Sequence, residues 1–315
     1  MKHGKQKMSW ICGIIILGLV ATADLFIGCS SAGVEIITKL RLPRIVTAML
    51  AGGALALSGL QMQSILRNPL ADPHIMGISA GAALGAAIAT MTGLNGMSIM
   101  LSSFTGAIIS AAIILAASSK LKRAATLLIF GVMSGFIINA VISILQFSTD
   151  AESLKIFYSW SAGSFSLAKW SDIGIIAAAT VIGYIIAAAN SRRFDTILFG
   201  DDFAEMTGTD VSSTRICGLL SCCLMTGAVT AVCGPLGFVG IVAPHIARNI
   251  FRTSSHHTTL PASLLTGCII GASADLLSVL SPHPVPVSST MALIGIPIIV
   301  YILIKDSRNF NGIAE

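Results

Sequence analysis

The sequence predicts an all-α integral membrane protein with about ten transmembrane helices and a single domain over residues 1–315. The chain is 54% hydrophobic and only 10% charged, whereas soluble domains carry about 25% charged residues. Arg41–Gly85 combines a nearly unbroken apolar run with many glycines and alanines, interrupted at Arg67-Asn68-Pro69. Small residues let helix backbones approach inside a bilayer, where lipid supplies no hydrophobic drive between helices. Protein or a watery cavity must cover the backbone groups freed by such a break.

The first predicted span is Ile11–Ile27, and its flanks leave one alternative open. Lysines followed by an apolar run are also the plan of a signal peptide, and Gly28-Cys29-Ser30 faintly resembles a lipoprotein cleavage site. Asp24 interrupts the apolar region and the rest of the chain is itself spanning. A retained first helix is therefore the favoured interpretation.

Nine further apolar runs complete the predicted spans, since one span takes about 20 residues. Leu236–Ile250 is the least typical run because it is short and contains Pro244, His245 and Arg248. The nine are Ile45–Leu60, Ile75–Met91, Ile99–Ala117, Ala125–Leu145, Ile173–Ala189, Ile216–Val232, Leu236–Ile250, Leu260–Leu280 and Met291–Ile304.

The distribution of lysine and arginine supports ten spans with the N-terminus inside. In that arrangement fourteen of the nineteen basic residues lie on the inner side and five on the outer side, as the positive-inside rule requires. Lys305 and Arg308 are then inside, so both termini are expected in the cytoplasm. The five outer residues are Lys39, Arg41, Arg44, Lys155 and Lys169.

Two connections are long enough to do more than join helices. The outer one, Phe147–Asp172, contains aromatic residues suited to a membrane interface or to a short helix lying on it. The inner one, Asn190–Arg215, is the most charged segment of the chain. Acidic residues from Asp201 suit the start of a short helix, and Gly208 suits its end. A short helix in this segment favours its interpretation as a docking element over the alternative of a solvated loop.

Polar groups inside the predicted spans are few. Asn139, Ser143 and Gln146 are spaced i, i+4, i+7 and therefore share one helix face. Two interpretations remain open, namely hydrogen bonds to neighbouring helices and the lining of a water-filled path. Asp24 and Asp275 are the acids closest to membrane depth, near the outer ends of their spans.

Other motifs do not indicate chemistry. Gly77-Ile78-Ser79-Ala80-Gly81 matches G-x-S-x-G, but it opens a membrane helix and lacks the strand that a nucleophile elbow needs. The seven cysteines include no C-x-x-C pair, and the six histidines have no partner at helical ligand spacing, so neither a disulfide framework nor a metal site is expected. No G-x-x-x-x-G-K-[ST] occurs, so any ATP used would bind to another chain.

Three stretches together resemble the FecCD type of ABC-importer membrane subunit, a family that carries iron–siderophore complexes, haem and cobalamin. They are RLPR…GGALALSGLQMQSILRNPLADPHIMGISAGAALG (Arg41–Gly85), CGPLGFVGIVAPHIARNI (Cys233–Ile250) and MALIGIPIIVYIL (Met291–Leu303). LFGDDFAEMTGTDV (Leu198–Val211) is also similar to a segment of that family. The match runs in order over nearly the whole chain.

The resemblance implies a cobalamin-importer-like bundle of ten helices, paired with a second permease subunit, most simply as a homodimer. Two separate ATP-binding subunits would supply ATP hydrolysis, and a substrate-binding protein would dock outside. No enzyme activity, cofactor, bare-metal site or nucleic-acid partner is implied for this chain. Matching positions would be Arg41 and Arg44 for binding-protein docking, and Asn139, Ser143 and Gln146 for the translocation path. Ala124 and Ala125 would lie near the inner gate, and the ATPase coupling segment, about residues 195–215, would use Gly200, Asp201, Asp202, Ala204, Glu205, Met206 and Gly208.

The chain departs from the family near its last span, where Val279 replaces a common arginine and His283-Pro284 replaces an acid. Part of the docking surface expected from the resemblance therefore differs in this chain. Breaks at Pro69, Pro73, Pro235 and Pro244, with ADPHIMG at Ala71 echoing VAPHIAR at Val242, predict a weak internal repeat. An ion-gradient-driven secondary transporter is the alternative function, with Asp24 and Asp275 as its candidate acids. An intramembrane protease using Ser79 is a more remote one.

Overall fold

The computed structural model describes residues 2–27, 34–94, 96–121, 123–166, 168–280 and 285–311, and these residues form helices without any strand. The Gly28-Cys29-Ser30 and His283-Pro284 motifs of the sequence lie outside the described residues. The elements are α1 (Lys2–Phe26), α2 (Val34–Ile36), the π-helical turn η1 (Ile37–Arg41), α3 (Leu42–Leu66), α4 (Ile78–Met91), α5 (Met97–Lys120), α6 (Ala124–Phe147), α7 (Ala151–Ser161), α8 (Trp170–Ala189), α9 (Ser191–Ile197), α10 (Asp201–Met206), α11 (Val211–Cys233), α12 (Val239–Phe251), α13 (His256–Leu280) and α14 (Val287–Asn311).

Every predicted span lies largely within a helix, but the helices differ in length. Seven are long and apolar enough to cross a membrane: α1, α3 with η1, α5, α6, α8, α11 and α13. Helix α4 and the apolar part of α14 are shorter. Helix α12 has 13 residues, which is about 20 Å of helix against a hydrocarbon core of about 30 Å. The predicted runs Ile75–Met91 and Leu236–Ile250 therefore start before the helices themselves, because their first residues belong to non-helical breaks.

The core of the bundle is α3, which packs closely against α13 and α12. An added Cβ on Gly52 would lie 2.2 Å from the carbonyl oxygen of Gly267 on α13. One on Gly59 would lie 1.9 Å from the carbonyl oxygen of Gly240 on α12. Both helix pairs approach at distances that only glycine permits, as the composition predicted.

The Gly77–Gly81 pattern serves the same kind of packing. An added Cβ on Gly81 would lie 2.4 Å from Cβ of Ser110 on α5. Ser79 is buried, and its hydroxyl lies 3.4 Å from that of Thr230 on α11. This contact is to another hydroxyl and not to a base, so it favours small-residue packing over the protease alternative.

The structure corrects one predicted helix break. Pro244 lies inside α12 and does not interrupt it. A proline in a helix frees the carbonyl four residues earlier, which here is that of Gly240. The side-chain amide of Gln63 on α3 donates to this oxygen over 3.1 Å and to that of Ile241 over 3.3 Å. Because α3 satisfies the freed carbonyl, α12 continues through the proline.

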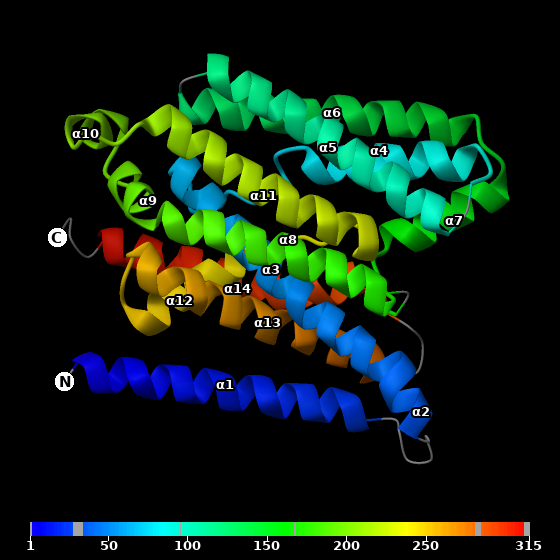
Figure 1. Cartoon of the computed structure of the whole chain (residues 1–315), viewed down its shortest axis with the longest axis horizontal. Coiled ribbons are helices and arrows are strands. Elements are labelled where there is room, and N and C mark those ends of the chain that lie inside the picture. Colours follow the sequence, from blue (N-terminus) through cyan, green and yellow to red (C-terminus); the bar gives the residue numbers. More distant parts are fainter. Residues whose placement is uncertain are drawn as a thin grey trace.

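The two ends of the molecule carry different elements (Figure 1). Helix α1 begins and α14 ends at the same end as α9 and α10, whereas α2 and α7 lie at the opposite end. Helix α3 starts from α2 and runs towards the α9–α10 end. The arrangement agrees with the predicted grouping of both termini with the inner charged segment.

Candidate functional site

Two helix breaks meet inside the bundle. The first spans residues 67–77 between α3 and α4 and ends at Gly77, with φ of 85°. The second spans residues 234–238 before α12 and ends at Phe238, with φ of 71°. Asp72 lies between them, because its buried carboxylate accepts a hydrogen bond from the backbone N–H of His74, at 2.9 Å, and its Oδ1 lies beside Gly240 at the start of α12. Protein therefore covers the first break, as the apolar surroundings required.

A groove of about 710 Å³ lies beside these breaks. Its walls come from the first break and α4, from α6, from α7, and from the second break before α12. Ser288 of α14 completes the lining. Most of its surface is apolar or small, and among its lining residues only His74 is titratable.

The groove brings together the three predicted path residues. Asn139, Ser143 and Gln146 all line it from α6. The Ser143 hydroxyl donates to the carbonyl of Asn139 within the same helix, over 3.0 Å. These placements favour the lining interpretation over hydrogen bonds to neighbouring helices.

At the opposite end from α10, the two predicted docking arginines differ in environment. Arg44 forms an ion pair with Asp275 of α13, with Nη2–Oδ1 at 2.7 Å and Nε 2.8 and 3.0 Å from the two carboxylate oxygens. The Asp275 side chain is 1% exposed and that of Arg44 21%. Arg41 makes one long contact of 3.4 Å to the backbone carbonyl of Asp24. The charge of Arg44 is thus largely neutralised inside the protein.

The coupling segment folds as two short helices, α9 and α10, at the other end of the molecule (Figure 1). Gly200, with φ of 118°, precedes α10, and Gly208, with φ of 82°, follows it. Asp201 accepts from Arg215 of α11 over 2.8 Å and lies 3.4 Å from Arg67. Ala204 is buried between the helices. These four residues, Gly200, Asp201, Ala204 and Gly208, therefore stabilise the fold of the segment and do not form most of its exposed surface.

The exposed surface of α10 combines acids with large apolar side chains. Asp202 and Glu205 are exposed as predicted, and Met206 is 87% exposed. Phe199 and Phe203 are also exposed, with ring centroids 5.3 Å apart. The sequence analysis missed these two phenylalanines, although their positions on both sides of the acid pair in LFGDDF were a usable signal.

The predicted inner gate lies away from the path residues. Ala124 is buried at the first position of α6, and Ala125 beside it is exposed. Asn139 is 14 positions further along the same helix, which is about 21 Å. Helix α6 begins at the end of the molecule that holds α10 (Figure 1), so these alanines precede the groove residues on the α10 side of the helix.

The helical bundle, the groove with polar side chains and the exposed segment at one end define a multi-span membrane permease. Comparison with known proteins gives the family. The model of the FecCD transport family matches residues 8–305, and the chain belongs to this family.

Its relatives are permease subunits of ABC transporters. The cobalamin import system permease protein BtuC of Halobacterium salinarum is 33% identical over 91% of this chain and 78% of its own length. The hemin transport system permease protein HmuU of Yersinia pestis is 32% identical over 87% of this chain and 84% of its own. A solved structure of a metal-chelate type ABC transporter in an inward-facing conformation has 27% identity and a TM-score of 0.87, covering 95% of this chain and 99% of that chain.

Proposed function

We propose that this chain is the membrane subunit through which an ABC importer moves an iron chelate, haem or a cobalamin-like metal complex across the cytoplasmic membrane. The observation that carries the proposal is the exposed acidic and aromatic α10, which lies at the opposite end of the bundle from Arg41. Separate ATPase subunits would bind at the first end and a substrate-binding protein at the second. The termini, which share the α10 end, would both be cytoplasmic.

The groove supplies the path in this proposal. Phe136, Asn139 and Ser143 line it and are themselves exposed. Polar side chains in a span are costly against lipid and face protein or a watery cavity instead. A second copy of the chain placed against α6 would close the groove and remove this cost. The active form would then be a homodimer with the path between its subunits.

The α10 surface supplies the ATPase contact. Phe203 and Met206 present apolar area, and Asp202 and Glu205 present negative charge around it. Aromatic residues and methionine are enriched in the cores of protein interfaces, with charge at their rims. Asp201 and Ala204 would act indirectly by holding α10 against α9 and α11. Ala124 and Ala125 would lie close to the inner gate.

At the outer end, Arg41 is the stronger candidate for contact with an acidic binding protein. Within the described residues its guanidinium makes a single long hydrogen bond, to the Asp24 carbonyl, whereas Arg44 is paired with Asp275. The same ion pair weakens the secondary-transporter alternative, because Asp275, one of its two candidate proton-carrying acids, is engaged by an arginine. The family relatives also fit the importer and not that alternative.

Uptake into reconstituted vesicles tests the proposal. The permease, its genomically neighbouring ATPase and binding protein would be assembled in proteoliposomes and offered ferric ferrichrome, haem and cobalamin in turn. We expect uptake of one of these to require ATP and the ATPase subunits, and to persist when ionophores collapse every ion gradient. Uptake that needs no ATPase and stops with the ion gradient would refute the proposal and favour the alternative.

A further inference from the structure

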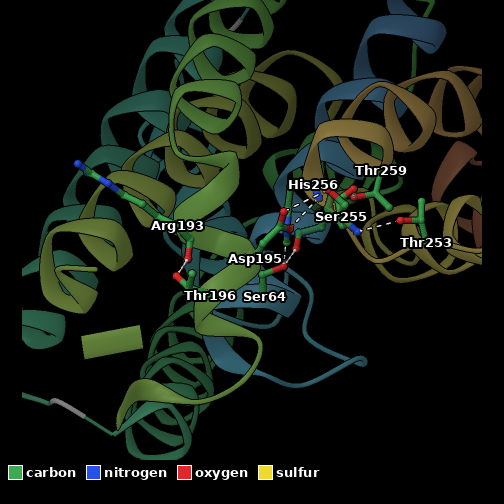
Figure 2. Close-up of polar contacts among 9 residues, drawn as sticks. Ser64, Arg193, Asp195, Thr196, Thr253, Ser255, His256 and Thr259 are labelled. Atoms are coloured by element: carbon green, nitrogen blue, oxygen red, sulfur yellow. Dashed lines mark hydrogen bonds and ion pairs between the residues drawn. The ribbon is translucent and has the colours of Figure 1, made fainter. Parts of the chain in front are cut away.

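Three side chains from three helices form a hydrogen-bonded row at the α9–α10 end of the molecule (Figure 2). His256, the first residue of α13, points Nδ1 at the Asp195 carboxylate of α9, with 2.6 Å between Nδ1 and Oδ1. Its Nε2 lies 2.7 Å from the hydroxyl of Ser64 in the last turn of α3. Asp195 also accepts from the backbone N–H of His256 over 2.8 Å and from the hydroxyl of Ser255 over 3.2 Å. We call this row the His256 link.

The order of the side chains is that of a catalytic triad, but the surroundings do not permit hydrolysis. Ser64 and His256 are both 0% exposed. The groove and the two other large cavities in the described part of the chain do not include Ser64 in their linings. The Ser64 hydroxyl also lies 2.9 Å from the carbonyl of Leu60, so it is engaged within its own helix. A substrate has no route to the hydroxyl, and the row is better explained by what it joins.

The imidazole can serve both of its contacts in two protonation states. When neutral, the ring donates a hydrogen bond from Nδ1 to Asp195 and accepts a hydrogen bond at Nε2 from the Ser64 hydroxyl. When charged, it donates from both nitrogens, and Ser64 keeps its own proton for the Leu60 carbonyl. In either state the ring is fixed at both ends, and the Phe194 ring lies against it with centroids 5.5 Å apart. The link is therefore rigid.

A second polar link joins the same parts of the chain. Arg67, three residues after Ser64, caps α3 in a left-handed conformation, and its guanidinium lies 3.4 Å from Asp201 of α10. Asp201 in turn pairs with Arg215 of α11 over 2.8 Å. Helices α9 and α10 are thus each attached to the end of α3. From that point the chain enters the break 67–77, where His74, Ile75 and Gly77 line the groove.

We propose that the His256 link carries movement of the α9–α10 segment to α3 and, through the break 67–77, to the groove. His256 would be a positioning residue for transport, held between Asp195 and Ser64. The inference rests on the proposed function, because it requires an ATPase that moves α9–α10. The physical basis is the contact of His256 with Asp195 on one side and with buried Ser64 on the other, followed by the chain itself, which runs from the end of α3 through residues 67–77 to the groove wall.

The first experiment tests the link in the isolated permease by amide hydrogen exchange. Exchange reports local opening, which buried hydrogen bonds suppress. We expect His256→Gln to accelerate exchange in residues 191–206 by about tenfold or more, in line with the loss of a hydrogen bond to a charged group. His257→Gln is the matched control, since His257 is the exposed neighbour of His256. Equal exchange in the two variants would overturn the link.

Ser64→Ala provides a milder test should His256→Gln fail to fold. It removes one hydroxyl from α3 and leaves the hydrogen bond between His256 and Asp195. Its matched control is Ser58→Ala on the same helix, because the Ser58 hydroxyl is buried and has no hydrogen-bond partner in the described part of the chain. Faster exchange at 191–206 in Ser64→Ala alone supports the link, and equal exchange in both serine variants contradicts it.

The second experiment tests transmission in the permease–ATPase complex. A non-hydrolysable ATP analogue is expected to change exchange at residues 67–77 in the wild type and in His257→Gln. In His256→Gln and Ser64→Ala we expect the ATPase to stay bound while this response falls on the order of tenfold, as for a lost coupling between two sites. A merely structural role would lower the yield of complex without changing the response of the complex that forms.

The outcomes separate this inference from the proposed function. A wild-type permease that binds no ATPase would refute the proposed function, and the transmission role with it. An ATPase that binds every variant, with an undiminished response at 67–77, would overturn the transmission role and leave the proposed function standing.

Discussion

The ion pair between Arg44 and Asp275 gives the sharpest prediction about stability. Arg44→Gln would remove three contacts of 2.7 to 3.0 Å and leave the Asp275 carboxylate, 1% exposed, without its cation. Removing one partner of a buried ion pair costs about 3–5 kcal/mol. The lower end applies here because a fifth of the Arg44 side chain reaches solvent. We therefore expect a loss of about 3 kcal/mol.

Thermal melting of the detergent-solubilised permease measures this loss. In a chain of this size 1 kcal/mol corresponds to about 2 °C, so Arg44→Gln should lower the midpoint by about 6 °C. Arg41→Gln is the matched control, because the hydrogen bond that Arg41 makes within the described residues is long, 3.4 Å to a backbone carbonyl. Its midpoint should fall by less than about 2 °C. The double variant Arg44→Gln/Asp275→Asn should recover part of the loss, since position 275 then carries no buried charge that lacks its cation.

Equal midpoints for Arg44→Gln and Arg41→Gln would refute the reasoning. The result also decides how docking is tested. If Arg44 is structural, reversing its charge would unfold the outer end and mimic a docking defect. Charge reversal at Arg41 is then the informative change, and its effect on binding-protein affinity should be larger at low salt, because exposed charges are screened.

Three further predictions concern the path, the packing and the acid response. Asn139→Leu should lower uptake in proteoliposomes about fivefold, the value of one lost hydrogen bond, without changing ATPase binding. Gly53→Cys should cross-link to native Cys268 under oxidation, because an added Cβ at Gly53 lies 3.0 Å from the Cys268 sulfur, and non-reducing mass analysis detects the link. Burial alone would raise the pKa of Asp195, but the hydrogen bonds and charge of His256 outweigh it and hold the pKa below the ordinary value of 3.8. The contribution of ionised Asp195 to the stability of the fold is therefore complete above pH 3.8 and is lost as the pH falls through the lowered pKa. Thermal melting measured across this acid range should show the loss of stability in the wild type and not in Asp195→Asn.

Periodicity and composition were sufficient to predict most of the helices. Apolar runs place the spans, and the i, i+4, i+7 spacing places Asn139, Ser143 and Gln146 on one groove wall. Local signals also predicted α10, because two acids start it and Gly208 follows its end.

Contacts between distant parts of the sequence could not be predicted in the same way. Arg44 and Asp275 are 231 positions apart, and Ser64 and His256 are 192 apart. No spacing rule connects such residues, so Arg44 was assigned to docking from the resemblance alone. Pro244 illustrates the same limit, since its effect on α12 depends on Gln63, which lies on another helix.

These distant contacts have one shared consequence, which is that α3 and α13 are joined along their whole length. Arg44 pairs with Asp275 at one end, Gly52 meets Gly267 near the middle, and Ser64 meets His256 at the other end. A polar contact at each end and backbone packing between them leave little freedom for sliding or tilting. The pair is therefore expected to move as one rigid body during transport, with the groove changing shape at α4 and α6 instead. Loss of uptake on cross-linking Gly53→Cys to Cys268 would contradict this, whereas unchanged uptake is the expected result.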